Sequence, residues 1–123
     1  MKENNYNNLW LAFVNLKAKK GFVFKDLIDF EDTEEKINYK GAWANIIIKS
    51  KNIKEAFDII PLGLDELNFE VIFIDKIENI GSLIEYKEIS NDVKSEADWL
   101  LKNNFVFKIS DRLFPYKSNV EIR

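Results

Sequence analysis

The sequence predicts an α+β fold: one antiparallel sheet with two helices on one face, formed by a single domain over residues 1–123. Three observations predict it. The length of 123 residues suits one domain and falls short of two. Short apolar runs alternate with stretches of helical periodicity. The sequence has only two prolines and four glycines, and it shows no linker-like stretch that would mark a domain boundary.

The first third of the chain predicts a hairpin. Residues 9–16 are a short apolar run that is typical of a buried strand. A Lys-Lys-Gly turn at residues 19–21 follows, and residues 22–24 are the expected partner strand. Residues 25–40 are rich in acids and favour neither helix nor strand. A strong strand is expected over residues 42–49.

The first helix is expected over residues 52–60. Asn52 is a good N-cap residue, and Glu55 three positions later completes a capping box. Pro61 is expected to end this helix, because proline lacks the N–H that the next helical hydrogen bond requires. Gly63 adds a second expected break, after which another turn of helix over residues 64–67 is left open.

The second half of the chain predicts three strands. Residues 69–75 are apolar on both faces, which is typical of a central strand. Residues 82–89 mix apolar and charged side chains, as an edge strand does when charge protects it from further pairing. Residues 105–109 are the last expected strand, and the tail after them is expected to fray.

The second helix is expected over residues 92–103, with Ser90 or Asn91 as its cap. Asn103 and Asn104 are expected to supply a left-handed stop. Helical spacing predicts a buried stripe made of Val93, Ala97, Leu100 and Leu101.

The expected elements over residues 42–109 follow the order strand, helix, strand, strand, helix, strand. This is the ferredoxin-like (βαββαβ) order, here with an added N-terminal hairpin. Both helices would then cover one face of the sheet. The other face would be free or covered by the hairpin. A free face of a sheet is a usual place for a second copy of the chain to bind, so a homodimer is one of the expected alternatives.

Composition excludes several classes of function. The chain has no histidine and no cysteine, which removes Ser-His-Asp catalysis, the usual zinc sites and disulfides. We therefore expect no catalytic residues, no metal and no cofactor. A net charge of −3 argues against nucleic acid as a partner. The apolar run at residues 9–16 is too short to cross a bilayer, so we expect no membrane contact and a cytoplasmic location.

The strongest local feature is an acidic cluster. Six carboxylates fall within ten residues: Asp26, Asp29, Glu31, Asp32, Glu34 and Glu35. Clustered charge of this kind speeds encounter with a basic partner and fixes its orientation. The alternatives are a solvated segment and a site for a hard cation, although the spacing of an EF-hand loop is absent.

Trp99 is a second candidate for partner contact, since it adjoins the buried stripe of the second helix and tryptophan is enriched at binding hot spots. Ordinary core packing is its alternative. Catalysis by carboxylates alone would need two of them to converge in a cleft. The carboxylates on or beside predicted strands are Glu70, Asp75, Glu78, Glu85 and Glu88.

Together, the acidic run FKDLIDFEDTEE at residues 24–35 and the βαββαβ-like core from Ala42 to Ile109 resemble small immunity proteins of bacterial polymorphic-toxin and contact-dependent inhibition systems. The resemblance implies a non-enzymatic protein that binds and neutralises a cognate toxin, a basic domain being the partner that suits the acidic run. The alternative is a small-molecule-binding regulatory domain of ferredoxin-like fold that pairs as a dimer, with the break at Pro61 and Gly63 forming a ligand loop. An enzyme using only carboxylates is a third hypothesis.

Overall fold

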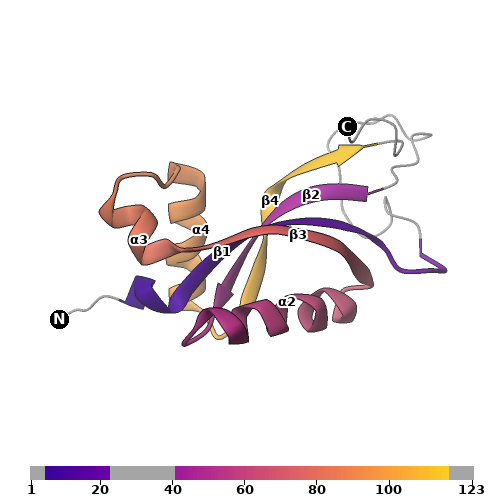
Figure 1. The fold of residues 1–123 in the computed structure, drawn as a ribbon, viewed down its shortest axis with the longest axis horizontal. Helices are drawn as coiled ribbons and strands as arrows, with labels where there is room; N and C mark the ends of the chain where they lie inside the picture. The colour runs from indigo at the N-terminus through magenta and orange to yellow at the C-terminus, as the bar shows by residue number, and fades with distance from the viewer. Residues whose placement is uncertain (1–4, 23–40, 117–123) are drawn as a thin grey trace.

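A computed structural model of the chain describes residues 5–22 and 41–116. These residues form an α+β fold in which helices lie on both faces of an antiparallel sheet (Figure 1). The elements in chain order are η1 (Asn5–Asn8), β1 (Leu9–Ala18), β2 (Gly41–Lys49), α2 (Ile53–Glu66), β3 (Phe69–Asn79), α3 (Ile80–Glu85), α4 (Asn91–Lys102) and β4 (Phe107–Tyr116).

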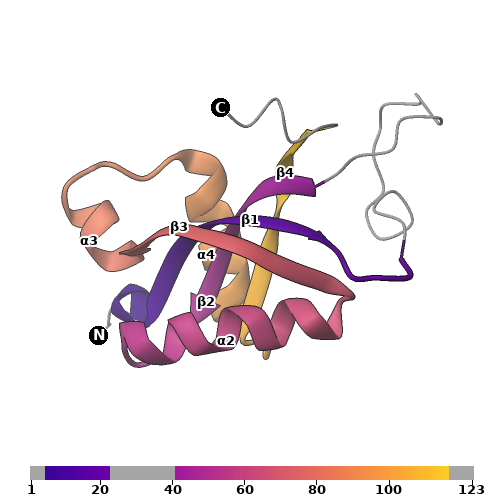
Figure 2. The same cartoon turned by 45° about the vertical axis from the view of Figure 1, so that its right-hand side comes forward.

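The sheet has the strand order β3-β1-β2-β4, and every neighbouring pair is antiparallel (Figure 2). The strands predicted over residues 9–16 and 42–49 are confirmed as β1 and β2, which pair in the centre. The prediction that residues 69–75 form a central strand is wrong, because β3 lies at one end of this order.

The ferredoxin-like order is not confirmed. The edge strand predicted over residues 82–89 is wrong, because residues 80–85 form the short helix α3. Asn79 caps this helix, and its Oδ1 accepts a hydrogen bond from the Ser82 N–H at 3.0 Å. Ile80 and Leu83, three positions apart, are its buried side chains, which is helical and not strand spacing. In the ferredoxin-like order, the strand predicted at residues 82–89 would lie between β2 and β3. β1 occupies that position instead.

The hairpin expected within the first 24 residues is not confirmed. β1 pairs with β2 from Leu9 to Leu16 on one side and with β3 on the other. Phe22 lies outside any strand. Residues 23–40, which include the rest of that predicted strand, lie outside the described residues.

The helices α2 and α4 lie on opposite faces of the sheet, so the prediction that both helices cover one face is wrong (Figure 1). α2 packs in one buried cluster with Val14 and Ile46, whereas α4 packs in a second with Leu9 and Ile47. Residues 46–48 are all fully buried. Because successive side chains of a strand point to opposite faces, β2 must be covered on both sides.

α2 begins as predicted, with Asn52 as N-cap accepting the Glu55 N–H at 2.9 Å. The predicted end at Pro61 is wrong, because the helix continues to Glu66. Proline at this position leaves the Phe57 carbonyl without its helical N–H partner. Both residues lie on the exposed side of α2, where water can satisfy that carbonyl, so the helix tolerates the proline.

α4 also begins as predicted. Ser90 is its cap, and the Ser90 Oγ accepts the Val93 N–H at 3.2 Å. The predicted stripe is buried at Val93, Ala97 and Leu100, and Leu101 is half-buried. The left-handed stop predicted at Asn103 is wrong, because this residue is extended with φ −124° and ψ 163°.

β4 runs well beyond the predicted end of the last strand at residue 109. The expectation that the tail frays is wrong for residues 110–116, which belong to β4. Tyr116 is buried, and its hydroxyl donates a hydrogen bond to Oδ1 of the buried Asn15 on β1 at 2.6 Å. This bond satisfies two polar groups on the same face of the sheet and fastens the end of β4.

Gly63 does not break α2; it sets how closely the helix approaches the sheet. The residue is buried, and a Cβ built on it would overlap the ring of Phe107 on β4. The predicted break at Gly63 is therefore wrong, because the glycine serves close packing and not a turn. No helix in the described part of the chain is long and apolar enough to span a membrane.

The Gly63→Ala substitution tests this packing role. Helix propensity alone would make alanine more stable by about 1 kcal/mol. We expect the opposite sign, a loss of about 1–3 kcal/mol, because the added methyl must displace a packed aromatic ring. Urea unfolding measures the difference. The control is Leu62→Ala on the exposed side of the same helix, and a stabilised Gly63→Ala protein would contradict the prediction.

Candidate functional site

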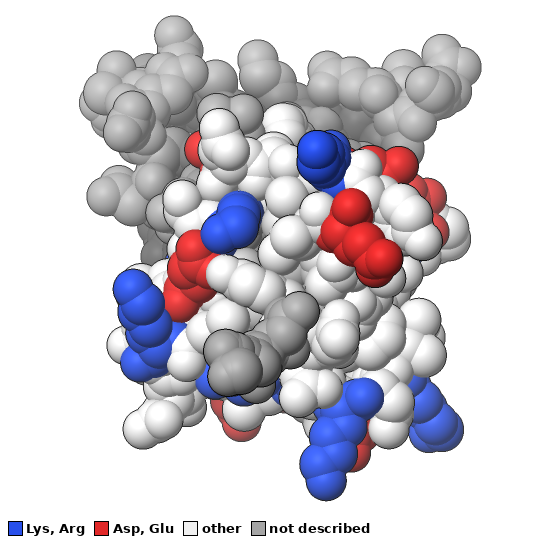
Figure 3. Space-filling model, turned by 90° about the vertical axis from the view of Figure 1, so that its left-hand side faces the viewer, with Lys and Arg blue, Asp and Glu red and all other residues white. Residues whose placement is uncertain are grey.

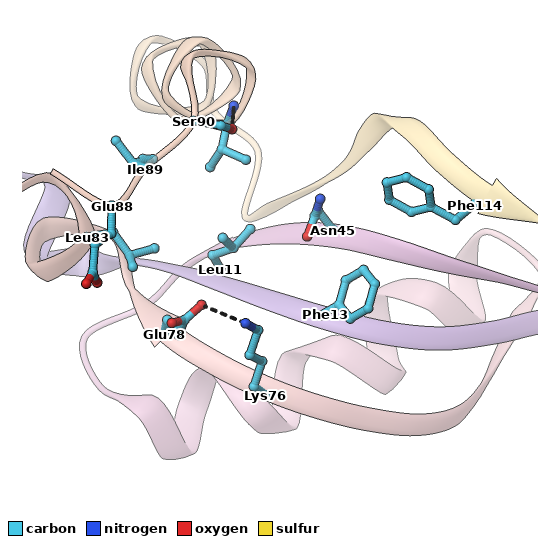
Figure 4. Close-up of a pocket in the computed structure, with 11 residues that line it drawn as sticks. Leu11, Phe13, Asn45, Lys76, Glu78, Leu83, Glu88, Ile89, Ser90 and Phe114 are labelled. Atoms are coloured by element: carbon cyan, nitrogen blue, oxygen red, sulfur yellow. Dashed lines mark hydrogen bonds and ion pairs between the residues drawn. The ribbon is translucent and has the colours of Figure 1, made fainter. Parts of the chain in front are cut away.

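An open groove of about 440 Å³ lies on the sheet face that carries α3 and α4 (Figure 4). We call it the β1–α4 groove. β1 supplies its floor, the segment between α3 and α4 forms one wall, and β3 and β4 supply the remaining sides. Its lining residues are Leu11, Phe13, Asn45, Lys76, Glu78, Leu83, Glu88, Ile89, Ser90, Val93 and Phe114.

The wall of the groove depends on how α3 ends. Lys87 adopts a left-handed conformation with φ 59°, and its N–H bonds to the Ile84 carbonyl at 3.1 Å. The Glu88 N–H bonds to the Leu83 carbonyl at 2.8 Å. These two bonds form a Schellman motif, which reverses the chain direction at the end of a helix. The reversal sends Glu88 and Ile89 back along the groove.

The mouth of the groove is aromatic. The rings of Phe13 and Trp43 stack with centroids 5.0 Å apart, and Phe114 meets Phe13 edge-on at 6.3 Å. The strand register brings them together, because Trp43 pairs with Phe114 across β2 and β4. Phe114 is 46% exposed. Exposed aromatic rings next to polar groups are typical of protein-binding surfaces.

The polar groups of the groove carry both signs of charge. Lys76 and Glu78 on β3 approach each other to 3.8 Å, and both side chains are partly exposed. Glu88 is exposed on the opposite wall. Asn45 projects from β2 where the β2–β4 register shifts. The groove therefore offers hydrogen-bond donors and acceptors around an apolar floor.

Two of the five strand-region carboxylates considered in the sequence, Glu78 and Glu88, line this groove together. The other three do not line it. A carboxyl that acts as a general acid is normally kept from water in apolar surroundings. Glu88 is exposed and Glu78 is paired with Lys76, so neither has that environment. The arrangement favours recognition over acid–base catalysis.

The predicted partner-binding residues fall in two places. The acidic cluster, Asp26 to Glu35, lies outside the described residues. Trp99 is 41% exposed on α4, stacks on Phe105 at 5.6 Å and has the Lys108 ammonium 5.6 Å from its ring centre. It does not line the groove. Its role in partner contact stays a prediction.

The face of the molecule that carries η1, α3 and α4 has acidic and basic side chains interspersed (Figure 3). On this face, no large area of one sign is visible among the described residues. Within the residues that the structure describes, no group of three or more acidic side chains is placed to hold a metal ion.

Tyr6, Lys94 and Asp98 form a polar cluster that joins η1 to α4. The Tyr6 hydroxyl donates to Asp98 Oδ1, and the Lys94 ammonium lies 3.4 Å from Asp98 Oδ2 and 5.4 Å from the Tyr6 ring centre. The hydrogen bond to Asp98, with partial burial, raises the pKa of Tyr6 above its ordinary value of 10.0. The hydrogen bonds to Tyr6 and Asp98 also raise the pKa of Lys94. The cluster fastens η1 to α4 and lies outside the groove.

This cluster predicts an alkaline pH dependence of stability. Because the pKa of Tyr6 is higher in the folded chain than in the unfolded one, its stabilising effect is complete below pH 10.0 and is lost as pH rises through the folded pKa. We expect Tyr6→Phe to cost about 1 kcal/mol at neutral pH, since the pair is solvent-accessible. The difference from the unsubstituted protein should vanish at high pH.

Thermal unfolding at a series of pH values measures this difference. The control is Tyr86→Phe, since Tyr86 is exposed on the C-cap of α3. A Tyr6→Phe deficit that is the same at neutral and at strongly alkaline pH would contradict the prediction.

Comparison with known protein families, curated proteins and solved structures gives no match.

Proposed function

We propose that this protein is a non-enzymatic protein-interaction protein that binds a partner protein through the β1–α4 groove. The observation that carries the proposal is the aromatic mouth of the groove, where Phe13 and Phe114 line it beside polar side chains and Trp43 stacks on Phe13 from outside the lining. Aromatic side chains that stay partly exposed lose water readily when a partner covers them, and they dominate binding energy at interfaces.

The lining indicates what kind of partner segment would fit. The apolar side chains of Leu11 on the floor and Val93 on α4 would accept an apolar side chain. The Lys76–Glu78 pair and Glu88 at the rim would take hydrogen-bonding groups of either charge. We therefore expect a segment that presents one apolar anchor flanked by polar residues. Such a division into apolar centre and polar rim is usual for non-obligate complexes.

The Phe114→Asp substitution tests the groove. It places a charge at the mouth, and we expect partner binding to weaken by about 2 kcal/mol, roughly thirtyfold in Kd. The partner is first identified by a photo-crosslinking amino acid at position 114, and its affinity is then measured by calorimetry. Circular dichroism checks that the variant folds.

The matched control is Leu62→Asp, which adds the same charge at an exposed apolar residue of α2, on the opposite face of the sheet. It should bind the partner as the unsubstituted protein does. Equal binding by both variants would show that the groove is not the binding surface.

We also propose the partner class. The resemblance to immunity proteins of bacterial toxin systems suggests a cognate toxin, bound in the cytoplasm and neutralised without chemistry. Support for a basic toxin domain comes from the acidic cluster in the sequence alone. The groove, with both signs of charge on its rim, supports a protein partner and does not by itself favour a toxin.

Charge reversal tests the acidic cluster separately from the groove. A variant with Asp26, Asp29, Asp32 and Glu35 changed to lysine should bind a basic toxin at least tenfold more weakly, and the salt dependence of binding should fall. Reversal of Asp58 and Asp65 on α2 is the control, because both are exposed acidic residues outside the cluster. Unchanged binding by the fourfold variant would remove the cluster from the binding site.

A small-molecule-binding regulatory domain is the second candidate. The groove volume of about 440 Å³ favours it, since ligand sites in proteins have volumes of about 300–1,000 Å³. The ligand loop expected at Pro61 and Gly63 does not support it, because both residues lie within α2. A metabolite that raises the melting temperature of the unsubstituted protein, but not of Phe114→Asp, would favour this function over the first.

A further inference from the structure

The outer edge of β3 has no strand partner among the described residues, although β3 is eleven residues long. Its inner edge pairs with β1 from Phe69 to Asn79. Figure 2 shows β3 along the near edge of the sheet, above α2. Two large apolar side chains in its middle are exposed, Ile72 by 46% and Phe73 by 55%. Long apolar edge strands of this kind readily pair with another chain.

Two register shifts in the pairing of β3 with β1 change which side chains of β3 lie on the same face of the sheet. The shifts leave Ile72 and Asp75 as extra residues relative to β1. Glu70, Phe73 and Lys76 then pair with Lys17, Asn15 and Phe13, which alternate along β1 and so share one face of the sheet. On that face β3 carries an acid, an aromatic ring and a base at equal spacing.

We propose that β3 pairs in an antiparallel manner with β3 of a second copy of this chain, about a two-fold axis at Phe73. In this register Phe73 lies opposite Phe73 of the other copy. Glu70 lies opposite Lys76 of the other copy, and the two-fold axis repeats that pair. Ile72 lies opposite Ile74 twice. Opposite charges and apolar pairs directly across two strands both stabilise a sheet.

The neighbouring registers lack this complementarity. A shift by one residue in one direction places Glu70 opposite Asp75, which are like charges. A shift by two residues places Glu70 opposite Ile74 in one direction and opposite Glu78 in the other. Charges and bulges on an edge strand usually discourage pairing. A shift by one residue in the other direction places Glu70 opposite Ile77. Of the registers within two residues, only the proposed one places Glu70 opposite Lys76, so the charges favour that register over its neighbours.

The dimer would join two four-stranded sheets into one continuous sheet and leave both β1–α4 grooves on its surface. Glu70, Ile72 and Phe73 do not line the groove, whereas Lys76 lines it and lies 3.8 Å from Glu78 there. Of these four residues only Lys76 belongs to both proposals, and the test of the dimer needs no partner or ligand.

Single-cysteine cross-linking tests the register directly, because the chain has no cysteine of its own. Residues directly opposite in an antiparallel pair have Cα atoms about 4.5–5.5 Å apart, within reach of a disulfide. Phe73→Cys should therefore form a disulfide-linked dimer on mild oxidation. Asp75→Cys is the control on the same strand, since two copies of Asp75 would lie about 13 Å apart along the strand.

We expect Phe73→Cys to cross-link on the order of a hundredfold faster than Asp75→Cys, because pairing raises the effective concentration of one thiol near the other. Equal rates for the two variants would overturn the proposed register.

Charge exchange tests the same pairing in the absence of cysteine. By analytical ultracentrifugation, the unsubstituted protein should dimerise, and Glu70→Lys and Lys76→Glu should each weaken the dimer about tenfold. The double variant, with both residues exchanged, should recover the original dimer because the opposite charges are restored. A monomeric unsubstituted protein, or a double variant weaker than both single ones, would overturn the proposal.

Discussion

The pairing of β1 with β2 is the interaction on which the rest of the structure depends. The two strands pair from Leu9 with Lys49 to Leu16 with Ala42, and both are buried on both faces over much of their length. A strand pair that is apolar on both faces needs cover on both sides. α2 covers one side, and α3 with α4 covers part of the other. The part they leave uncovered contains the mouth of the β1–α4 groove.

Local signals in the sequence predicted the elements near the centre of the fold well. Strands at residues 9–16 and 42–49 are apolar enough to be unambiguous, and the caps at Asn52 and Ser90 fix two helix starts by a hydrogen bond between near neighbours. Helix ends were harder, because they depend on tertiary contacts. Pro61 lies on the exposed side of α2, where its missing hydrogen bond costs little, and this exposure is a property of the fold.

The strand order could not be predicted from the sequence, because several apolar runs are suited to the central positions of the sheet and tertiary packing decides which of them lie there. The segment at 82–89 has strand-like composition, but its two buried residues are three positions apart and the Asn79 cap favours a helix. β1 then takes the place beside β2. For the same reason, sequence reasoning missed the groove. Phe13 and Trp43 lie within the apolar runs that predict the two strands, and nothing in those runs marks them as surface residues. Only the strand register places them beside Phe114, where the helices leave the sheet uncovered.

The two strands at the ends of the sheet order, β4 and β3, differ in how they are held. β4 ends in Tyr116, whose hydrogen bond to Asn15 fastens it to the interior. β3 has no comparable anchor at its middle and instead exposes Ile72 and Phe73. While Ile72 and Phe73 stay exposed, they contribute no burial free energy, which is worth about 25 cal/mol per Å². Because the outer edge of β3 has no strand partner within residues 5–22 and 41–116, a second chain that covers these two side chains would add that free energy to the complex.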